Sequence, residues 1–487
     1  MPNAIRASTA SAPSWSRAAI IGLAAMVGVS AVVRGAAMGN SLWLDEVWTL
    51  RNIAELKSAS GIFTQFLNDN NHPLASLWMY VARDTTADWL HRLPAWLAGI
   101  ACVWLAGEIG RAQFRRVRPA APSAGSDAAG LIAAALVASA YMLTVYFSEA
   151  RGYGPMLAGA LLAILALLRD PDGETWRWPI LYWFACALGL LAHATVVNVM
   201  AGGAAWSLVR AVGGAAKPGA WLRALRWHAV PMTGAAIYYA AFLRHLGIGG
   251  GPETTALAVV GEAVSFTVGL PAHLALTAAA IIALITGLGW LWPRSRELAA
   301  LYFVTVVAAP LATIMFSRFS LLFPRYLILS CAGALLVGGI FLALLWRRNR
   351  LAAVAIVALV IAGQTPSTLE LLRHGRGDFR AVLRHLASGT RTPEISVCSD
   401  HDNRTLPLIQ RYAPSTLTGR PIRYVPGNSP RRHAARWLLV ADVGDTTPGP
   451  EARDAAGNTF TLEASLPHAP LSGSGWLIYR DRTFPDP

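Results

Sequence analysis

The sequence has few charged residues and few cysteines, and each shortage excludes a class of protein. Of the 487 residues only 14% are charged, whereas 54% are hydrophobic. Soluble domains carry about a quarter charged residues, so water is not the main solvent for this chain. The lack of any CxxC pair excludes a disulfide framework and a cysteine-based metal site. The chain has only four cysteines, which are far apart: Cys102, Cys186, Cys331 and Cys398.

Acidic residues are also scarce. There are 27 Asp and Glu against 41 Lys and Arg, which gives a formal net charge of +14. A protein that binds duplex nucleic acid needs a contiguous basic surface. Here the basic residues stand in short clusters between apolar runs, as at 111–118 and 347–350. Such clusters orient membrane helices, so nucleic acid is not an expected partner.

Apolar runs long enough to cross a bilayer as a helix recur about eleven times along the chain. The run after Arg17 has no small-residue cleavage site before Ser41, so we expect a membrane helix here and not a cleaved signal peptide. The expected spans lie near residues 18–38, 92–110, 128–147, 154–168, 178–193, 195–211, 228–243, 273–292, 298–316, 325–346 and 351–365.

The distribution of Lys and Arg predicts the orientation of these spans. The connections that hold Arg17, 111–118 and 347–350 all fall on one side of the membrane. Because Lys and Arg accumulate in short cytoplasmic loops, this side and the N-terminus are predicted to be cytoplasmic. The loop 40–91 and the tail from 366 onward are then predicted to lie outside the cytoplasm.

The tail, residues 366–487, reads as a small soluble α/β domain. The predicted architecture is therefore a polytopic all-α membrane domain, residues 1–365, followed by a C-terminal α/β extracytoplasmic domain. A helix is predicted over 378–388, where four apolar residues share one face: Phe379, Val382, Leu383 and Leu386. Short β-rich runs separated by Pro, Gly and Asn turn signals predict strands at 394–399, 421–425, 436–443, 459–466 and 475–480.

The loop 40–91 is the most informative segment. It opens with Asp45 and Glu46, just where the first span leaves the membrane. Ionised groups near hydrocarbon are costly and are usually kept for function. The alternative for Asp45 is a simple helix cap, a role that Asp fills well. The alternative for His72, which precedes Pro73, is a plain helix start.

The order of these motifs resembles one known group of enzymes. An Asp-Glu pair after the first span, an interfacial helix, the His-Pro-Leu of 72–74 and the Arg-Leu-Pro of 92–94 follow one another. This order resembles the bacterial GT-C membrane glycosyltransferases, which include protein mannosyltransferases, aminoarabinose transferases and the RgtA to RgtD type of lipopolysaccharide sugar transferase. The later segments 148–153 and 323–327 agree with the resemblance, which covers residues 1–365.

The resemblance implies a reaction and its partners. Members of the group move a sugar, with inversion, from a polyprenyl-phosphate donor to a glycan, lipid or protein acceptor outside the cytoplasm. The chain is accordingly expected in the bacterial inner membrane, in contact with membrane lipids. The loop 40–91 lacks a set of converging metal ligands, so no obligatory metal and no other cofactor is expected.

The resemblance also implies roles for individual residues. Asp45 matches the first acid of the group and is the expected general base, because a carboxylate can take the proton that the acceptor loses. Glu46 would orient Asp45 or the acceptor. Fixed cations are needed where the phosphate leaves, and the donor fork of Arg suits an oxyanion. The residues expected to contact the donor phosphate or the substrate are His72, Glu149, Arg151, Tyr153, Arg325 and Tyr326.

Several alternatives remain open at this stage. Glu149 and Arg151 would form an interfacial ion pair, and Arg325 and Tyr326 would serve as ordinary interface anchors. At the level of function, the rivals are a transporter or flippase of lipid-linked glycans and a non-catalytic scaffold for envelope assembly. A transporter usually carries ionisable residues at mid-membrane or broken helices in two related halves, and the sequence shows neither.

Overall fold

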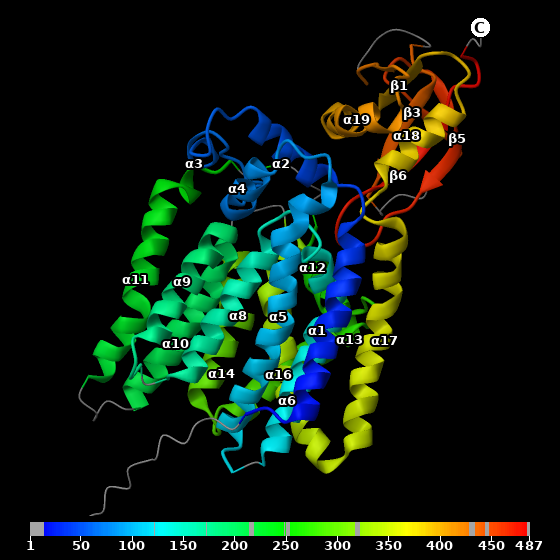
Figure 1. The fold of residues 1–487 in the computed structure, drawn as a ribbon. Helices are drawn as coiled ribbons and strands as arrows, with labels where there is room; N and C mark the ends of the chain where they lie inside the picture. Colours follow the sequence, from blue (N-terminus) through cyan, green and yellow to red (C-terminus); the bar gives the residue numbers. More distant parts are fainter. Residues whose placement is uncertain are drawn as a thin grey trace, which may run out of the picture.

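The computed structural model describes residues 14–120, 122–171, 173–213, 219–247, 249, 254–316, 322–427, 434–443 and 448–484. A bundle of long helices carries a small sheet domain at one end (Figure 1). At that same end lie the short helices α2 (Leu44–Ala54), α3 (Gly61–Thr64) and α4 (Pro73–Val81) (Figure 1). In the bundle, the helices are α1 (Arg17–Met38), α5 (Asp88–Val117), α6 (Ser123–Ser139), α7 (Tyr141–Tyr146), α8 (Tyr153–Arg169), α9 (Arg177–Ala192), η1 (Ala194–Val196), α10 (Val197–Gly213), α11 (Ala220–Ala241), η2 (Leu243–His245), α12 (Ala256–Val268), α13 (Leu274–Leu291), α14 (Arg296–Phe303), η3 (Val304–Ala308), α15 (Ala309–Phe316), η4 (Pro324–Leu327), α16 (Ile328–Arg348) and α17 (Arg350–His374).

The prediction of a multi-pass, all-helical membrane domain is confirmed, but the number of eleven spans is not. Within the described ranges, seven helical segments are long and apolar enough to cross a membrane, judged by length and composition. The predicted span 128–147 is divided, because α6 ends at Ser139 and α7 begins at Tyr141. The apolar helix α12 was not predicted. The seven segments are Arg17–Met38, Asp88–Val117, Ala194–Gly213, Leu274–Leu291, Arg296–Met315, Pro324–Arg348 and Arg350–His374.

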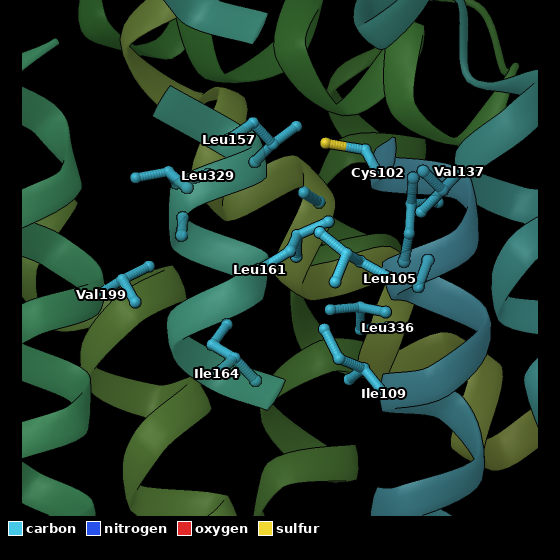
Figure 2. Close-up of a cluster of buried hydrophobic side chains, with 14 of the residues drawn as sticks. Cys102, Leu105, Ile109, Val137, Leu157, Leu161, Ile164, Val199, Leu329 and Leu336 are labelled. Carbon is cyan, nitrogen blue, oxygen red and sulfur yellow. The ribbon is translucent and has the colours of Figure 1, made fainter. Parts of the chain in front are cut away.

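The centre of the bundle is a close-packed apolar core built from α5, α6, α8, α10 and α16. Leu105 and Ile109 of α5 meet Leu161 of α8 and Leu336 of α16, and all four side chains are buried (Figure 2). Small residues allow the backbones to approach closely. At Gly110 a Cβ atom would lie 2.7 Å from the carbonyl oxygen of Ala129, so a larger residue would push α5 away from α6.

The sheet domain follows α17 and confirms the predicted α/β tail. Its six strands are β1 (Ile395–Ser399), β2 (Ile422–Tyr424), β3 (Trp437–Asp442), β4 (Glu451–Arg453), β5 (Thr459–Leu466) and β6 (Gly475–Arg480). They form one sheet in the order β2-β1-β3-β6-β5-β4, in which β1 pairs parallel with β2 and β3 and the other pairs are antiparallel. The five predicted strands are confirmed, and β4 was not predicted.

Two helices pack on this sheet, α18 (Phe379–Ser388) and α19 (Asp402–Thr416). The carboxylate of Asp378 accepts hydrogen bonds from the first free N–H groups of α18, as an N-cap does. The predicted apolar face of α18 is confirmed, because its four residues are completely buried. Sequence analysis missed α19, since the prolines Pro407 and Pro414 usually argue against a helix.

We expect the buried face of α18 to be essential for the stability of the sheet domain. Leu383→Ala removes a completely buried side chain and should cost about 2–5 kcal/mol. Thermal unfolding of the purified protein in detergent should show a lower midpoint for this variant. The neighbouring Arg384 is mostly exposed and makes only a long ion pair, so Arg384→Ala is the matched control and should leave the midpoint nearly unchanged. Equal midpoints for both variants would contradict the packing described.

Candidate active site

The site begins where α1 ends and the chain turns into α2 (Leu44–Ala54). Trp43 is the N-cap residue, and its backbone N–H donates to Oε2 of Glu46, 3.0 Å away. This bond is the half of a capping box in which an acid three residues on closes the first turn. Glu46 therefore fills the capping position. Within the described part of the chain, the side chain of Asp45 accepts no backbone N–H, so the alternative of Asp45 as a helix cap is wrong.

Asp45 forms an ion pair that leaves one of its oxygens open. Nη1 of Arg151 lies 2.7 Å from Oδ2 of Asp45. The other oxygen, Oδ1, accepts no hydrogen bond from any described residue, and 16% of the side chain is exposed. The main-chain oxygen of Asp45 accepts from the side chain of Asn70 at 2.7 Å, which ties the loop before His72 to α2. A carboxylate held in this way is fixed in place and still able to accept a proton.

Directly behind this pair lies a buried charge network, which consists of Glu46, Arg92, Glu149 and Arg376. Both oxygens of Glu46 are engaged by Arg92, at 2.8 and 2.5 Å, and neither side chain is exposed. Burial raises the pKa of Glu46, but the charge and hydrogen bonds of Arg92 outweigh it and leave that pKa below its usual value. Nε of Arg376 lies 3.0 Å from Oε1 of Glu149, again without exposure.

The network joins separate parts of the chain at one point. Oε1 of Glu46 accepts the backbone N–H of Ala150 at 2.6 Å, which fixes the loop between α7 and α8. Arg92 donates to three carbonyl oxygens at the end of α1. Glu46 and Glu149 thus help to hold this loop, because both carboxylates are fully buried and paired with arginines. The alternative ion pair between Glu149 and Arg151 is also wrong, since each has another partner.

Two histidines and two tyrosines form a stack beside Arg151. His72 is the N-cap residue of α4 (Pro73–Val81), and its ring centroid lies 5.1 Å from that of His193. Tyr153 contacts both rings, and Tyr326 lies 6.5 Å from His193. Burial and the charge of Arg151 lower the pKa of His72 well below its usual value and that of His193 to about 3. Both imidazoles are therefore neutral near pH 7, and the buried Nε2 of His72 has no hydrogen-bond partner.

Arg325 is a cation of the site that has no ion-pair partner among the described residues. Its guanidinium lies 3.8 Å from the ring centroid of Phe323 and 5.8 Å from that of Tyr326. Within the described ranges it makes no ion pair and no hydrogen bond, and its Nε is buried. The Nε atom of Arg151 is likewise buried and without a partner. A buried N–H group without an acceptor costs free energy. Such groups are typical of a site that binds an anion.

Asp69 belongs to the same region and was missed by sequence analysis. Its backbone N–H donates to the carbonyl oxygen of Gly247, 3.0 Å away. Burial and, to a smaller extent, the charge of Asp45 raise the pKa of its carboxyl group. The charges of Arg151 and Arg325 oppose this effect but do not outweigh it, so the pKa stays above its usual value. All three charges therefore act on Asp69. The sequence feature that could have indicated Asp69 is the polar run 68–71, immediately before His72.

The predicted site residues thus fall into two sets. One region at the end of the bundle that carries the sheet domain (Figure 1) is lined by Asp45, Arg151, His72, Tyr153, Arg325 and Tyr326, whereas Glu46 and Glu149 lie buried beside it. His193 and Asp69 join the first set, and Arg92 and Arg376 join the second. Among the described residues, no group of three or more His, Cys, Asp or Glu side chains is arranged to hold a metal ion.

The buried charge network should be sensitive to the loss of a single partner. Arg92→Met leaves Glu46 buried without its counter-charge and should destabilise the protein by about 3–5 kcal/mol. The double variant Glu46→Leu/Arg92→Met removes both charges and should regain much of that loss, as a double-mutant cycle measured by thermal unfolding would show. Additive effects of the two single substitutions would contradict the direct pairing.

Comparisons with known proteins agree with this architecture. No protein-family model and no curated protein matches the chain. The fold is similar to that of ArnT from Cupriavidus metallidurans, solved in the apo state (TM-score 0.51) and bound to undecaprenyl phosphate (TM-score 0.50). Both matches have 12% identity and cover 96% of this chain and 100% or 99% of ArnT.

The arabinofuranosyltransferase AftD from Mycobacteria matches with a TM-score of 0.49 and 14% identity, over 96% of this chain and 40% of AftD. At identities this low, the likeness to ArnT establishes the fold alone. The resemblance predicted from the motifs is confirmed at that level. The chain has the same overall fold as ArnT.

Proposed function

We propose that the protein is an inverting glycosyltransferase that moves a sugar from a polyprenyl-phosphate donor to an acceptor outside the cytoplasm. The observation that carries the proposal is the open oxygen of Asp45, held by Arg151 and close to Arg325, which has no ion-pair partner among the described residues. A base for the acceptor and cations for a leaving phosphate are the two requirements of this reaction. The likeness to ArnT, which was solved with bound undecaprenyl phosphate, supports the type of donor.

Asp45 acts as the general base in this proposal. The acceptor oxygen or nitrogen attacks the anomeric carbon of the sugar, and its proton passes to Oδ1 of Asp45. The bond between the anomeric carbon and the phosphate oxygen breaks at the same time, and its electron pair leaves with the polyprenyl phosphate. Because the attack comes from the face opposite the leaving group, the configuration at the anomeric carbon inverts.

Arg325 and Arg151 hold the donor phosphate. The leaving phosphate gains a negative charge as the bond breaks, so a fixed guanidinium stabilises the transition state more than the bound donor. The Nε2 of His72, which has no partner in the protein, is available for a further hydrogen bond with the bound substrate. Tyr153 and Tyr326 fix the orientation of the two histidines through the ring contacts of the stack.

The charge balance favours a donor with a single phosphate. Arg151 is already neutralised by Asp45, and both histidines are neutral because burial and nearby arginines depress each pKa. Arg325 makes no ion pair with a described residue, although the carboxyl group of Asp69 lies close enough to feel its charge. The site thus offers at most one unpaired positive charge, which matches the single negative charge of a phosphodiester better than the two charges of a diphosphate.

The remaining predictions belong to the same proposal. Glu46 and Glu149 act as positioning residues, although Glu149 was expected to contact the substrate, and no metal or other cofactor takes part. The protein lies in a bacterial inner membrane with its N-terminus in the cytoplasm, so that α2 and the sheet domain lie outside. The acceptor is a glycan, a lipid or a protein of the cell envelope.

Asp45→Asn should abolish most of the sugar transfer, because Asn keeps the shape of the side chain but cannot take a proton. The rate should fall by at least about 100-fold, while donor binding changes little. The measurement is transfer of labelled sugar from a synthetic polyprenyl-phosphate donor to an envelope extract, with the protein in membrane vesicles. Asp84→Asn, at an exposed carboxylate of the same outer segment, is the control and should be silent. Transfer at the wild-type rate by Asp45→Asn would refute the assignment of the base.

Arg325→Met should weaken binding of the donor phosphate. Loss of one charge-assisted hydrogen bond costs about 1.5–3 kcal/mol, which corresponds to roughly a tenfold or greater rise in Kd. Binding of undecaprenyl phosphate to the purified protein measures this effect without any need for the acceptor. Arg83 is exposed and stacks on Tyr80, so Arg83→Met is the matched control. Equal affinity of the Arg325 variant and the wild type would exclude Arg325 from the phosphate site.

A further inference from the structure

The helix that carries Asp45 is covered by the sheet domain. Leu42 and Val47 are buried in the same apolar cluster as the buried faces of α18 and α19 and the centre of the sheet. Leu44 and Leu50 pack against that cluster from its edge. The eleven-residue α2 is thus part of the core of the sheet domain, although the helices from α5 to α17 separate it from that domain in sequence.

Polar contacts fix the start of α2 to α19. The hydroxyl group of the buried Tyr412 lies 3.2 Å from the carbonyl oxygen of Leu42 and 3.1 Å from Oδ2 of Asp88. Asp88, in the first turn of α5, also accepts from Arg380 at 2.9 Å and from Arg411 at 3.0 Å. The carboxylate of Asp88 in the membrane domain therefore binds three side chains of the sheet domain. This contact lies next to Leu42, three residues before Asp45.

Further contacts link the sheet domain to α2 and to the loop between α7 and α8. Nε1 of Trp48 donates to the carbonyl oxygen of Asn403, 2.9 Å away, one helical turn after Asp45. Arg376 contributes to the buried charge network and donates to the carbonyl oxygen of Val145 and the hydroxyl of Ser148, at 2.6 and 2.8 Å. Asp45, on α2, and Arg151, in the loop between α7 and α8, thus both belong to segments that contact the sheet domain.

We infer that the sheet domain positions the base, and that Tyr412 and Asp88 are positioning residues that act on Asp45 through the start of α2. The inference rests on the proposed function, because it assigns the sheet domain a part in the same reaction. A short surface helix has little stability of its own, so its orientation depends on what packs against it. A displacement of about 1 Å at a reacting group can reduce a rate by up to about 100-fold.

Tyr412→Phe in the full-length protein tests this inference with a minimal change. Removing the hydroxyl group should lower kcat about tenfold and leave KM for the polyprenyl-phosphate donor unchanged, because the donor site itself is intact. Asp88→Asn should act in the same direction, because it weakens the contacts to Arg380 and Arg411. The matched control is Glu394→Gln, which breaks an exposed ion pair with Arg423 at the far edge of the sheet and should leave both constants unchanged.

Hydrogen exchange provides a readout that does not depend on catalysis. In both variants the backbone amides of α2 should exchange faster than in the wild type, and in Glu394→Gln they should not. Unchanged exchange in α2 together with unchanged kcat would overturn the inference, and so would a rise of KM for the acceptor alone, which is the signature of an acceptor-binding module. If the wild type transfers no sugar, the proposed function fails, while faster exchange in α2 would still support the positioning of Asp45 by the sheet domain.

Discussion

Four charged side chains with almost no access to water determine how the candidate active site is built. Glu46, Arg92, Glu149 and Arg376 come from α2, α5, the loop before α8 and the start of the sheet domain, and each acid is paired with an arginine. A buried charge without its partner costs several kcal/mol, so these four elements have to meet in one arrangement. That arrangement brings Asp45, next to Glu46 along the chain, within 2.7 Å of Arg151, which follows Glu149 by two residues.

Much of the fold could be predicted because the signals are local. Runs of apolar residues indicate the spans, and the spacing of Phe379, Val382, Leu383 and Leu386 indicates the buried face of α18. The Asp-Glu pair at 45–46 and the segment 148–153 stand out as polar groups at membrane exits, where charge is costly. Both motifs do lie face to face in the structure, with 2.7 Å between the atoms of the Asp45–Arg151 pair.

The partners of these motifs could not be predicted, because they are distant in sequence. Arg376 lies 227 residues after Glu149, and nothing in its surroundings reveals that it pairs with a membrane-domain acid. The pairing of Glu46 with Arg92 could not be predicted either, since the sequence does not distinguish which of two adjacent carboxylates is buried. The helix α19 was missed because its prolines oppose helix formation locally, whereas packing against α2 and α18 stabilises it.

The central claim is that a carboxylate at the outer membrane surface takes the proton from an acceptor that displaces a polyprenyl phosphate in one step. The stereochemistry of the product tests it most directly. The protein would be reconstituted in vesicles with a polyprenyl-phosphate sugar of known anomeric configuration and an envelope acceptor, and the product would be analysed by NMR. The account predicts a single product of inverted configuration and one free polyprenyl phosphate for each sugar transferred. A product with retained configuration, or sugar that remains on the lipid, would contradict it.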